Sequence, residues 1–344
     1  DAAGEAGQPQ DRSSALLLAA WIEASTGHLE LARRHIATAT ELAEEIHNLD
    51  LQARCLYYLA YVVSHQGEFR QAMELTARSC AIYDGLDRPW DQAATWLFAA
   101  RAAISAGDQE RSVEAARQVQ RWVRMLEDPW LKVRSEAMLG ELARIQHRFH
   151  DAVLHIGRAA ETSRRLGFQQ TEAYQVASLG RAQCQAGDYQ AGAATLELAV
   201  DKAEATGDVR LAALARVHLG RVLRAVGQVA GARTALEAAS EWHRDSGGGE
   251  QATLGECLLA ALDAADRVPG APDRLAATLD DARHRDDAAV EVLALDALAR
   301  IAATTGDILA AHHLCQTADL RMEAASHFMT ELDRTDARWV RENA

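Results

Sequence analysis

Residues 179–192 read LGRAQCQAGDYQAG, and the pattern of this stretch recurs along the chain every 40 residues. Its turn residue is Gly187. The equivalent positions at whole multiples of that period hold Gly27, Gly67, Gly107, His147 and Gly227. Small residues stand at fixed distances from each turn, as Gly180 and Gly192 do here. We call such a set of equivalent positions in successive repeats a column. Small side chains in a column let helix axes approach closely, whereas larger side chains would force the axes apart. A repeat of this length is the signature of a stacked array.

A second set of turns falls halfway between the first. Gly167 in RLGF (165–168) and Gly207 in ATGD (205–208) are examples, and glycines at such points end helices. Between turns, apolar residues such as Leu56, Leu59 and Val63 follow a helical spacing. The sequence therefore predicts an all-α solenoid of about eight antiparallel helix pairs over residues 13–325, with a flexible tail at 1–12 and a capping helix at 326–344.

One irregularity interrupts the predicted array. Residues 267–274 read RVPGAPDR, which favours an extended loop at the place of the next turn. Such a loop is either a tolerated surface insertion or a hinge or partner contact.

The turn motif resembles the tetratricopeptide repeat. Its Leu-Gly, spacer and Gly-Asp-Tyr elements are clearest at Leu179-Gly180 and Gly187-Asp188-Tyr189. The usual tetratricopeptide period is ~34 residues, and the longer period here resembles the repeats of large bacterial signalling proteins of the maltose-activator type. Residues 294–322 look similar to the ends of such regions in actinobacterial proteins. The resemblance implies a right-handed superhelix whose inner groove binds ligands. It also implies that an ATPase, cyclase or DNA-binding part would lie outside this chain, which fits a start that lacks Met and suggests a fragment.

The composition limits the partners. The net charge is −14, so we expect no direct binding of nucleic acid or anionic membrane. The five cysteines are odd in number and far apart, which predicts buried thiols in a reducing cytoplasm rather than disulfides or zinc ligands. No apolar run is long enough for a membrane span, and the first residues do not resemble a signal peptide.

No motif for catalysis is found in the sequence. It contains no phosphate-binding GxxxxGK[ST] loop, no GxSxG and no HExxH. His147, His150 and His155 cluster around one turn, where solvated side chains explain them better than a metal site does. We therefore expect no enzyme activity, no metal and no cofactor.

The resemblance places certain columns of each first helix in the groove, and arginines and aromatics are frequent there. Arginine presents a planar fork of donors that suits carboxylates, and interface hot spots favour Trp, Tyr and Arg. We therefore predict a groove for an acidic peptide or protein segment. The predicted ligand-binding residues are Trp21, Arg54, Tyr57, Tyr61, Arg101, Arg134, Arg144, Tyr174, Arg181, Arg221, Arg224 and Arg300.

The alternative is that these arginines pair with neighbouring acids, because Glu141 and Asp296 stand in or near the same columns. The remaining tryptophans receive a structural interpretation: Trp96 falls on a core column, and Trp90 and Trp130 are expected to pack at matching turns.

Three functions remain open at this point. The leading prediction is a ligand-sensing or partner-binding region of a larger cytoplasmic signalling or transcription-regulating protein, with a protein, peptide or small effector as ligand. The alternatives are a free-standing adaptor and a receptor for a peptide pheromone.

Overall fold

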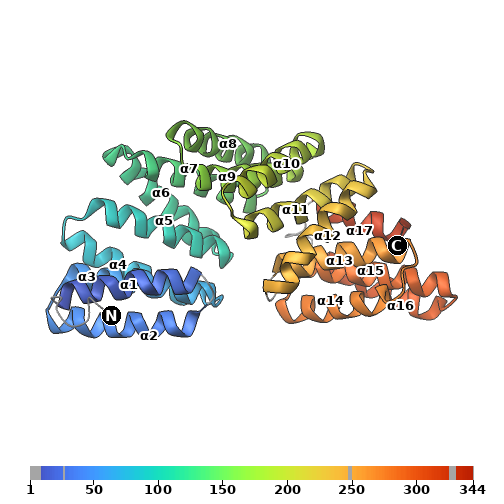
Figure 1. Cartoon of the computed structure of the whole chain (residues 1–344), viewed down its shortest axis with the longest axis horizontal. Coiled ribbons are helices and arrows are strands. Elements are labelled where there is room, and N and C mark those ends of the chain that lie inside the picture. The colour runs from blue at the N-terminus through green and yellow to red at the C-terminus, as the bar shows by residue number, and fades with distance from the viewer. Residues whose placement is uncertain (1–8, 26–27, 247–249, 325–330, 344) are drawn as a thin grey trace. The chain divides into compact units, whose positions relative to one another are not determined.

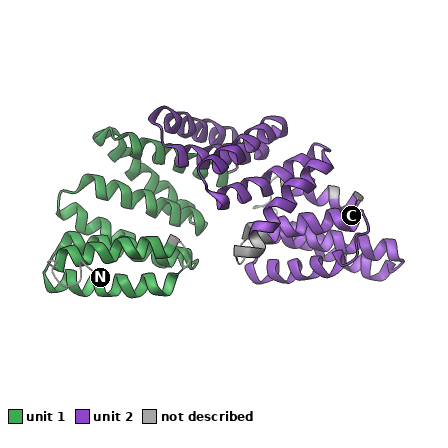
Figure 2. Cartoon of the chain, viewed as in Figure 1, with its two compact units in different colours: residues 1–146 green, residues 147–344 purple. Residues whose placement is uncertain are grey.

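The computed structural model describes residues 9–25, 28–246, 250–324 and 331–343, and these ranges form helices joined by short turns, without a strand (Figure 1). The chain divides into two compact units, unit 1 at residues 1–146 and unit 2 at residues 147–344 (Figure 2). The described part of unit 1 consists of three helix pairs followed by α7, and that of unit 2 consists of α8, four helix pairs and α17, so the boundary separates two helices that the repeat predicted to be a pair.

Unit 1 contains α1 (Pro9–Ser25), α2 (Leu29–Glu45), α3 (Leu49–His65), α4 (Phe69–Gly85), α5 (Pro89–Ser105), α6 (Gln109–Leu126) and α7 (Pro129–Ile145). Unit 2 contains α8 (Phe149–Leu166), α9 (Gln169–Gln185), α10 (Tyr189–Ala205), α11 (Val209–Ala225), α12 (Val229–Ser246), α13 (Glu250–Ala265), α14 (Ala271–Arg285), α15 (Ala288–Thr305), α16 (Ile308–Ala324) and α17 (Glu331–Asn343).

The turns fall where the sequence predicted them. Residues with positive φ recur at intervals of 20, at His47, Gly67, Asp87, Gly107, Glu127, His147, Gly167, Gly187, Gly207 and Gly227. Gly187 has φ +89°, and His147 adopts φ +56° in the same role. Glycine enters this left-handed region without steric cost, whereas histidine enters it at a cost. The turns expected at Gly27 and at 247–249 lie outside the described residues.

Aspartates start many of the helices. The side chains of Asp128, Asp188 and Asp208 accept hydrogen bonds from backbone N–H groups three residues later, at 2.8, 3.1 and 2.9 Å. Each bond satisfies an N–H group that the first turn of a helix leaves without a partner. Pro89 and Pro129 occupy first turns, where the missing N–H has no cost.

The columns of small residues form the contact between helices. The alanines of two such columns are fully buried, namely Ala20, Ala60, Ala100 and Ala260 before the turns and Ala32, Ala72, Ala152 and Ala232 after them. Within each unit the odd-numbered helices contact the next odd-numbered helix, while the even-numbered helices pack against helices adjacent to them in sequence. In each unit the odd-numbered helices therefore form a layer, which we call the odd-helix layer of that unit. The all-helical repeat that the sequence predicted is confirmed.

The boundaries of some elements differ from the prediction. Residues 267–274 were expected to form a loop, but α14 begins at Ala271, so residues 271–274 belong to its first turn, where Pro272 is tolerated. Arg267 itself adopts the left-handed turn conformation at φ +57°. Residues 9–12, predicted to be part of a flexible tail, are helical in α1, while 1–8 lie outside the described residues. In the segment expected as a capping helix (326–344), α17 is present, and residues 326–330 and 344 are not described.

Candidate functional site

Unit 1 carries a cluster of aromatic rings around one arginine, which we call the unit 1 site. It is built from Tyr57 and Tyr61 on α3 and from Phe98 and Arg101 on α5. The Phe98 ring centroid lies 5.6 Å from that of Tyr57 and 6.0 Å from that of Tyr61. The His65 ring meets Tyr61 edge-on at 4.6 Å. Because these residues stand three or four positions apart on two adjacent helices, they share one face.

Arg101 lies over this aromatic surface. Its Cζ is 4.6 Å from the centroid of Phe98 and 5.9 Å from that of Tyr61. A guanidinium above a ring is held by the ring's quadrupole and keeps its N–H donors free to reach other groups. The residue is exposed, and within the described part of the chain no carboxylate forms an ion pair with it. Arg101 is therefore a positioned cation whose donors can take an anionic ligand.

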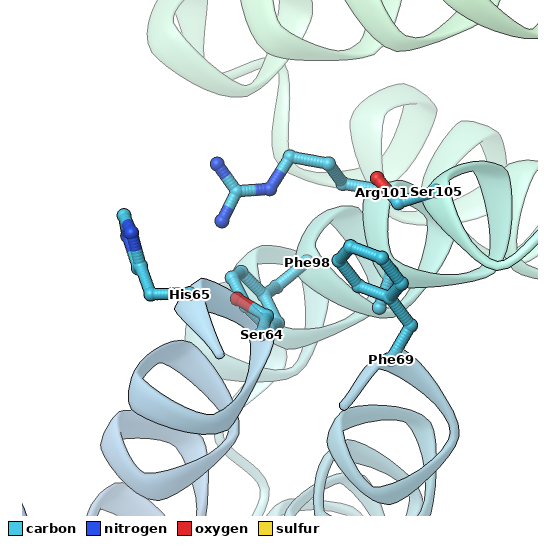
Figure 3. A pocket seen from close by; sticks show the side chains of 7 residues that line it. Ser64, His65, Phe69, Phe98, Arg101 and Ser105 are labelled. Carbon is cyan, nitrogen blue, oxygen red and sulfur yellow. The ribbon is translucent and has the colours of Figure 1, made fainter. Parts of the chain in front are cut away.

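A cavity opens beside this arginine (Figure 3). It has a volume of about 180 Å³, and its lining comprises Ser64, His65, Phe69, Phe98, Arg101, Ala102 and Ser105. The polar groups of this lining are the hydroxyls of Ser64 and Ser105, the ring of His65 and the guanidinium of Arg101, and the remaining residues are apolar. A site of this kind accepts one side chain or a short segment of peptide that combines an apolar part with a carboxylate.

A second pair of rings extends the aromatic surface within unit 1. Trp90, at the start of α5, stacks on Trp130, at the start of α7, with 5.6 Å between centroids and 30° between ring planes. Arg134 lies over Trp130 at 5.6 Å. The two tryptophans do pack at matching turns, as predicted, but they are exposed by 43% and 36% and do not belong to the core.

Tyr57 links these two groups electrostatically. Burial raises the pKa of its hydroxyl, and the positive charges of Arg101 and Arg134 act in the opposite direction. Both guanidinium groups thus influence the same phenol. Sequence analysis named the two tyrosines and both arginines but missed Phe98 and His65. Position 98 was detectable, because an aromatic three residues before Arg101 shares its helix face.

The other predicted residues of unit 1 have different surroundings. Trp21 is half-exposed on α1, and Arg54 is partly buried on α3. The Nε of Arg144 donates to Glu141 at 2.9 Å, so the alternative of pairing with a neighbouring acid holds at this position.

In unit 2 the structure corrects the prediction for Arg221 and Arg224. Both were expected to face a ligand, yet both are buried on α11 and form ion pairs with Asp333 and Asp336 of α17. The reason is that the C-terminal helix packs on α9, α11 and α15, across the odd-helix layer. Of the remaining predicted residues, Tyr174 is half-exposed on α9, and Arg181 and Arg300 are partly buried on α9 and α15.

The described residues hold no group of three or more His, Cys, Asp or Glu side chains arranged for a metal ion. Cys55, Cys80, Cys184 and Cys257 are buried, as predicted, and Cys315 is partly buried. Burial raises the pKa of the thiols of Cys80, Cys184 and Cys257 to about 12, which disfavours the reactive thiolate. None of the described helices is both long and apolar enough to cross a bilayer.

Asp296 on α15 should make stability depend on pH. Its carboxylate is buried, accepts a hydrogen bond from Nε of Arg341 at 2.8 Å, and has a pKa that burial raises to about 6 while Arg341 opposes the shift. The folded chain therefore binds this proton more tightly than the unfolded chain. We expect the free energy of unfolding to fall by at most ~3 kcal/mol as the pH rises from about 4 to about 6. Urea unfolding of the wild type and of Asp296→Asn across this range tests the prediction, because the variant should lack this slope; an equal slope in both would refute it.

No protein-family model matches the sequence, and no curated protein sequence matches it. Solved structures do match in fold. A signal transduction ATPase with numerous domains from Pyrococcus horikoshii, which has a tetratricopeptide repeat sensor, superposes with a TM-score of 0.66 at 14% identity over 93% of this chain and 50% of that one. The chain thus spans half the length of the Pyrococcus protein.

Two structures of Rap proteins are similar over nearly their whole length. One, complexed with competence and sporulation factor, gives a TM-score of 0.64 at 13% identity and covers 95% of this chain and 99% of that one. The other is the Rap conjugation gene regulator of the plasmid pLS20 in complex with the Phr* peptide, with a TM-score of 0.62 at 12% identity over 93% and 98% of the two chains. Identities this low show the fold alone, and that fold is a tetratricopeptide-like helical repeat.

Proposed function

We propose that this chain binds a protein or peptide segment rather than catalysing a reaction, and that the unit 1 site receives an acidic part of that segment. The observation that carries the proposal is Arg101, an exposed arginine held over Phe98 beside a cavity of about 180 Å³, with no ion-pair partner among the described residues. A guanidinium in this state offers two parallel donors to a carboxylate.

The surroundings of Arg101 fit a peptide better than a small ion. Tyr61 and Phe98 supply apolar area next to the cation, and the Trp90–Trp130 stack extends that area toward α7. Interfaces draw most of their affinity from such Trp, Tyr and Arg side chains. The chain as a whole is acidic, at −14, so attraction of an acidic ligand is local to this site.

The finer function that we propose is sensing or partner binding within a larger bacterial signalling or transcription-regulating protein, in the cytoplasm, with repeats of the maltose-activator type. The similarity to a signal transduction ATPase with a tetratricopeptide repeat sensor supports this reading. A second candidate is a receptor for a peptide pheromone, which the similarity to two peptide-bound Rap proteins favours. A free-standing adaptor is the third.

The test is a selection of random decapeptides on phage against the wild-type chain. Selected peptides should be acidic, and in fluorescence anisotropy they should bind Arg101→Ala at least about tenfold more weakly, because a hydrogen bond to a charged group contributes about 1.5–3 kcal/mol. The matched control is Arg111→Ala, which removes an exposed arginine of α6 that already pairs with Asp108. Its affinity should equal that of the wild type.

Neutral or basic peptides from the selection would contradict the proposal. So would acidic peptides that bind Arg101→Ala and the wild type equally well, since the working surface would then lie elsewhere on the chain.

A further inference from the structure

The helix α17 carries its contacts on one face. Asp333, Asp336, Ala337, Val340 and Arg341 follow the spacing of three, four, seven and eight residues that places them together. The first four of these are buried, whereas Arg334, Arg338 and Glu342 on the rest of the helix are exposed. The contact face lies on the odd-helix layer of unit 2, against α9, α11 and α15.

The core of this contact is a set of charged pairs. Asp336 receives donors from both Arg221 and Arg224, and Asp333 receives a second donor of Arg221. The Asp336 side chain is 0% exposed and the Arg224 side chain 1% exposed. Charge-assisted bonds of this kind are strong only while both partners remain in place, because either partner left alone would be buried without compensation.

A second pair of bonds holds the other end of α17. Arg341 donates from Nε to Asp296 at 2.8 Å and from Nη2 to Asp319 of α16 at 2.6 Å. Of the described α17 side chains, Ala337 and Val340 are the buried apolar ones. A helix of 13 residues is not stable in water by itself, so α17 depends on its contacts with the rest of unit 2 for its shape.

The repeat connects this contact to the unit 1 site. Arg101 and Arg221 occupy the same column of the repeat, six residues before Gly107 and Gly227. In unit 1 this column presents a cation to an open cavity, and in unit 2 it is filled by two aspartates three residues apart on a helix. The chain thus contains one example of what an arginine of this column binds.

We propose that the α9–α11–α15 surface of unit 2 is a docking site for a helix with two carboxylates three residues apart, that α17 is its internal occupant, and that a partner helix carrying the same pair of carboxylates displaces α17. This inference rests on the proposed function in one respect: both assume that an arginine of this column binds carboxylates. The two sites are otherwise independent, because they lie in different units. In this arrangement α17 is a built-in competitor, and a partner must bind more strongly than α17 to gain access to Arg221 and Arg224.

The test uses the full chain and a labelled synthetic peptide with the sequence of residues 331–343. In Asp333→Asn/Asp336→Asn the internal helix loses the two carboxylates that meet Arg221 and Arg224, so this variant should bind the peptide at least about tenfold more tightly than the wild type, a difference that one charged contact can supply. A control peptide with asparagine at both aspartates should bind neither protein. In the wild type, a large excess of the acidic peptide should speed amide hydrogen exchange in α17.

A second variant covers the case in which the double substitution unfolds the chain. Arg341→Gln weakens the hold of α17 and leaves Arg221 and Arg224 unchanged, so it should bind the peptide more tightly than the wild type does. The proposal would be overturned if every variant that keeps the helicity of the wild type also binds the peptide with the affinity of the wild type.

Two further outcomes would also overturn it and show where the peptide goes. Binding abolished by an added Arg101→Ala substitution would place the peptide in the unit 1 site, which supports the proposed function but not this one. A wild-type dimer that dissociates on peptide addition would mean that α17 of a second copy fills the site.

Discussion

Replacing Gly220 with valine should lower the free energy of unfolding by about 3 kcal/mol, since overpacking a well-packed core typically costs about 1–3 kcal/mol and the contact here is tight. A Cβ at this position would lie 2.6 Å from Cγ of Leu236 and 3.0 Å from the carbonyl oxygen of Ala232. Leu236 is fully buried, so it cannot move aside unless α12 shifts away from α11. Urea denaturation followed by far-ultraviolet circular dichroism measures the change.

The matched control is Gly157→Val on α8 in the same unit. A Cβ there would meet only Cδ1 of Leu179, at 3.9 Å, which is an ordinary contact. Glycine and valine differ by less than about 1 kcal/mol in helix propensity, so stability should change little. Equal losses for the two variants would mean that the small-residue column does not set the distance between helices.

Replacing Leu236 with alanine should cost about 2–5 kcal/mol, because a buried leucine leaves a cavity when it is truncated. Leu236 is 0% exposed and belongs to the largest apolar cluster of unit 2, with Val217, Leu258 and Leu275. The same denaturation experiment measures this loss.

Combining Leu236→Ala with Gly220→Val gives the sharper result. The truncation removes Cγ of Leu236, the atom closest to the new Cβ, so the valine side chain can occupy part of the cavity. The double variant should be more stable than the sum of the single effects predicts, by about 1 kcal/mol or more. Strictly additive losses would contradict the interlocked packing of α11 and α12.

The fold could be predicted from the repeat pattern because it depends on contacts within a helix pair and between successive helices. A small residue at position 180 or 220 and a turn residue at 187 or 227 act within one helix pair, and their spacing alone locates the helices. His147 was correctly assigned to a turn, because its register outweighed the low preference of histidine for positive φ. The start of α14 was missed because Pro272 favours a loop and a first helical turn about equally.

The surroundings of the arginines could not be predicted in the same way. Arg101 and Arg221 occupy the same position of the repeat. Arg101 nevertheless lies beside an open cavity, whereas Arg221 is buried under α17. That difference arises from a contact between residues more than 100 positions apart, such as Arg221 and Asp333. A periodic pattern has no information about a helix that stands outside the period.

The stacked indoles of Trp90 and Trp130 have a consequence for how unit 1 can be observed. They connect the first turns of two neighbouring odd-numbered helices, and their ring centroids are 5.6 Å apart. Two indoles this close share their electronic excitation, and the resulting optical signal decays steeply as the rings separate. A change in the spacing between the starts of α5 and α7 would therefore alter this signal without any added label.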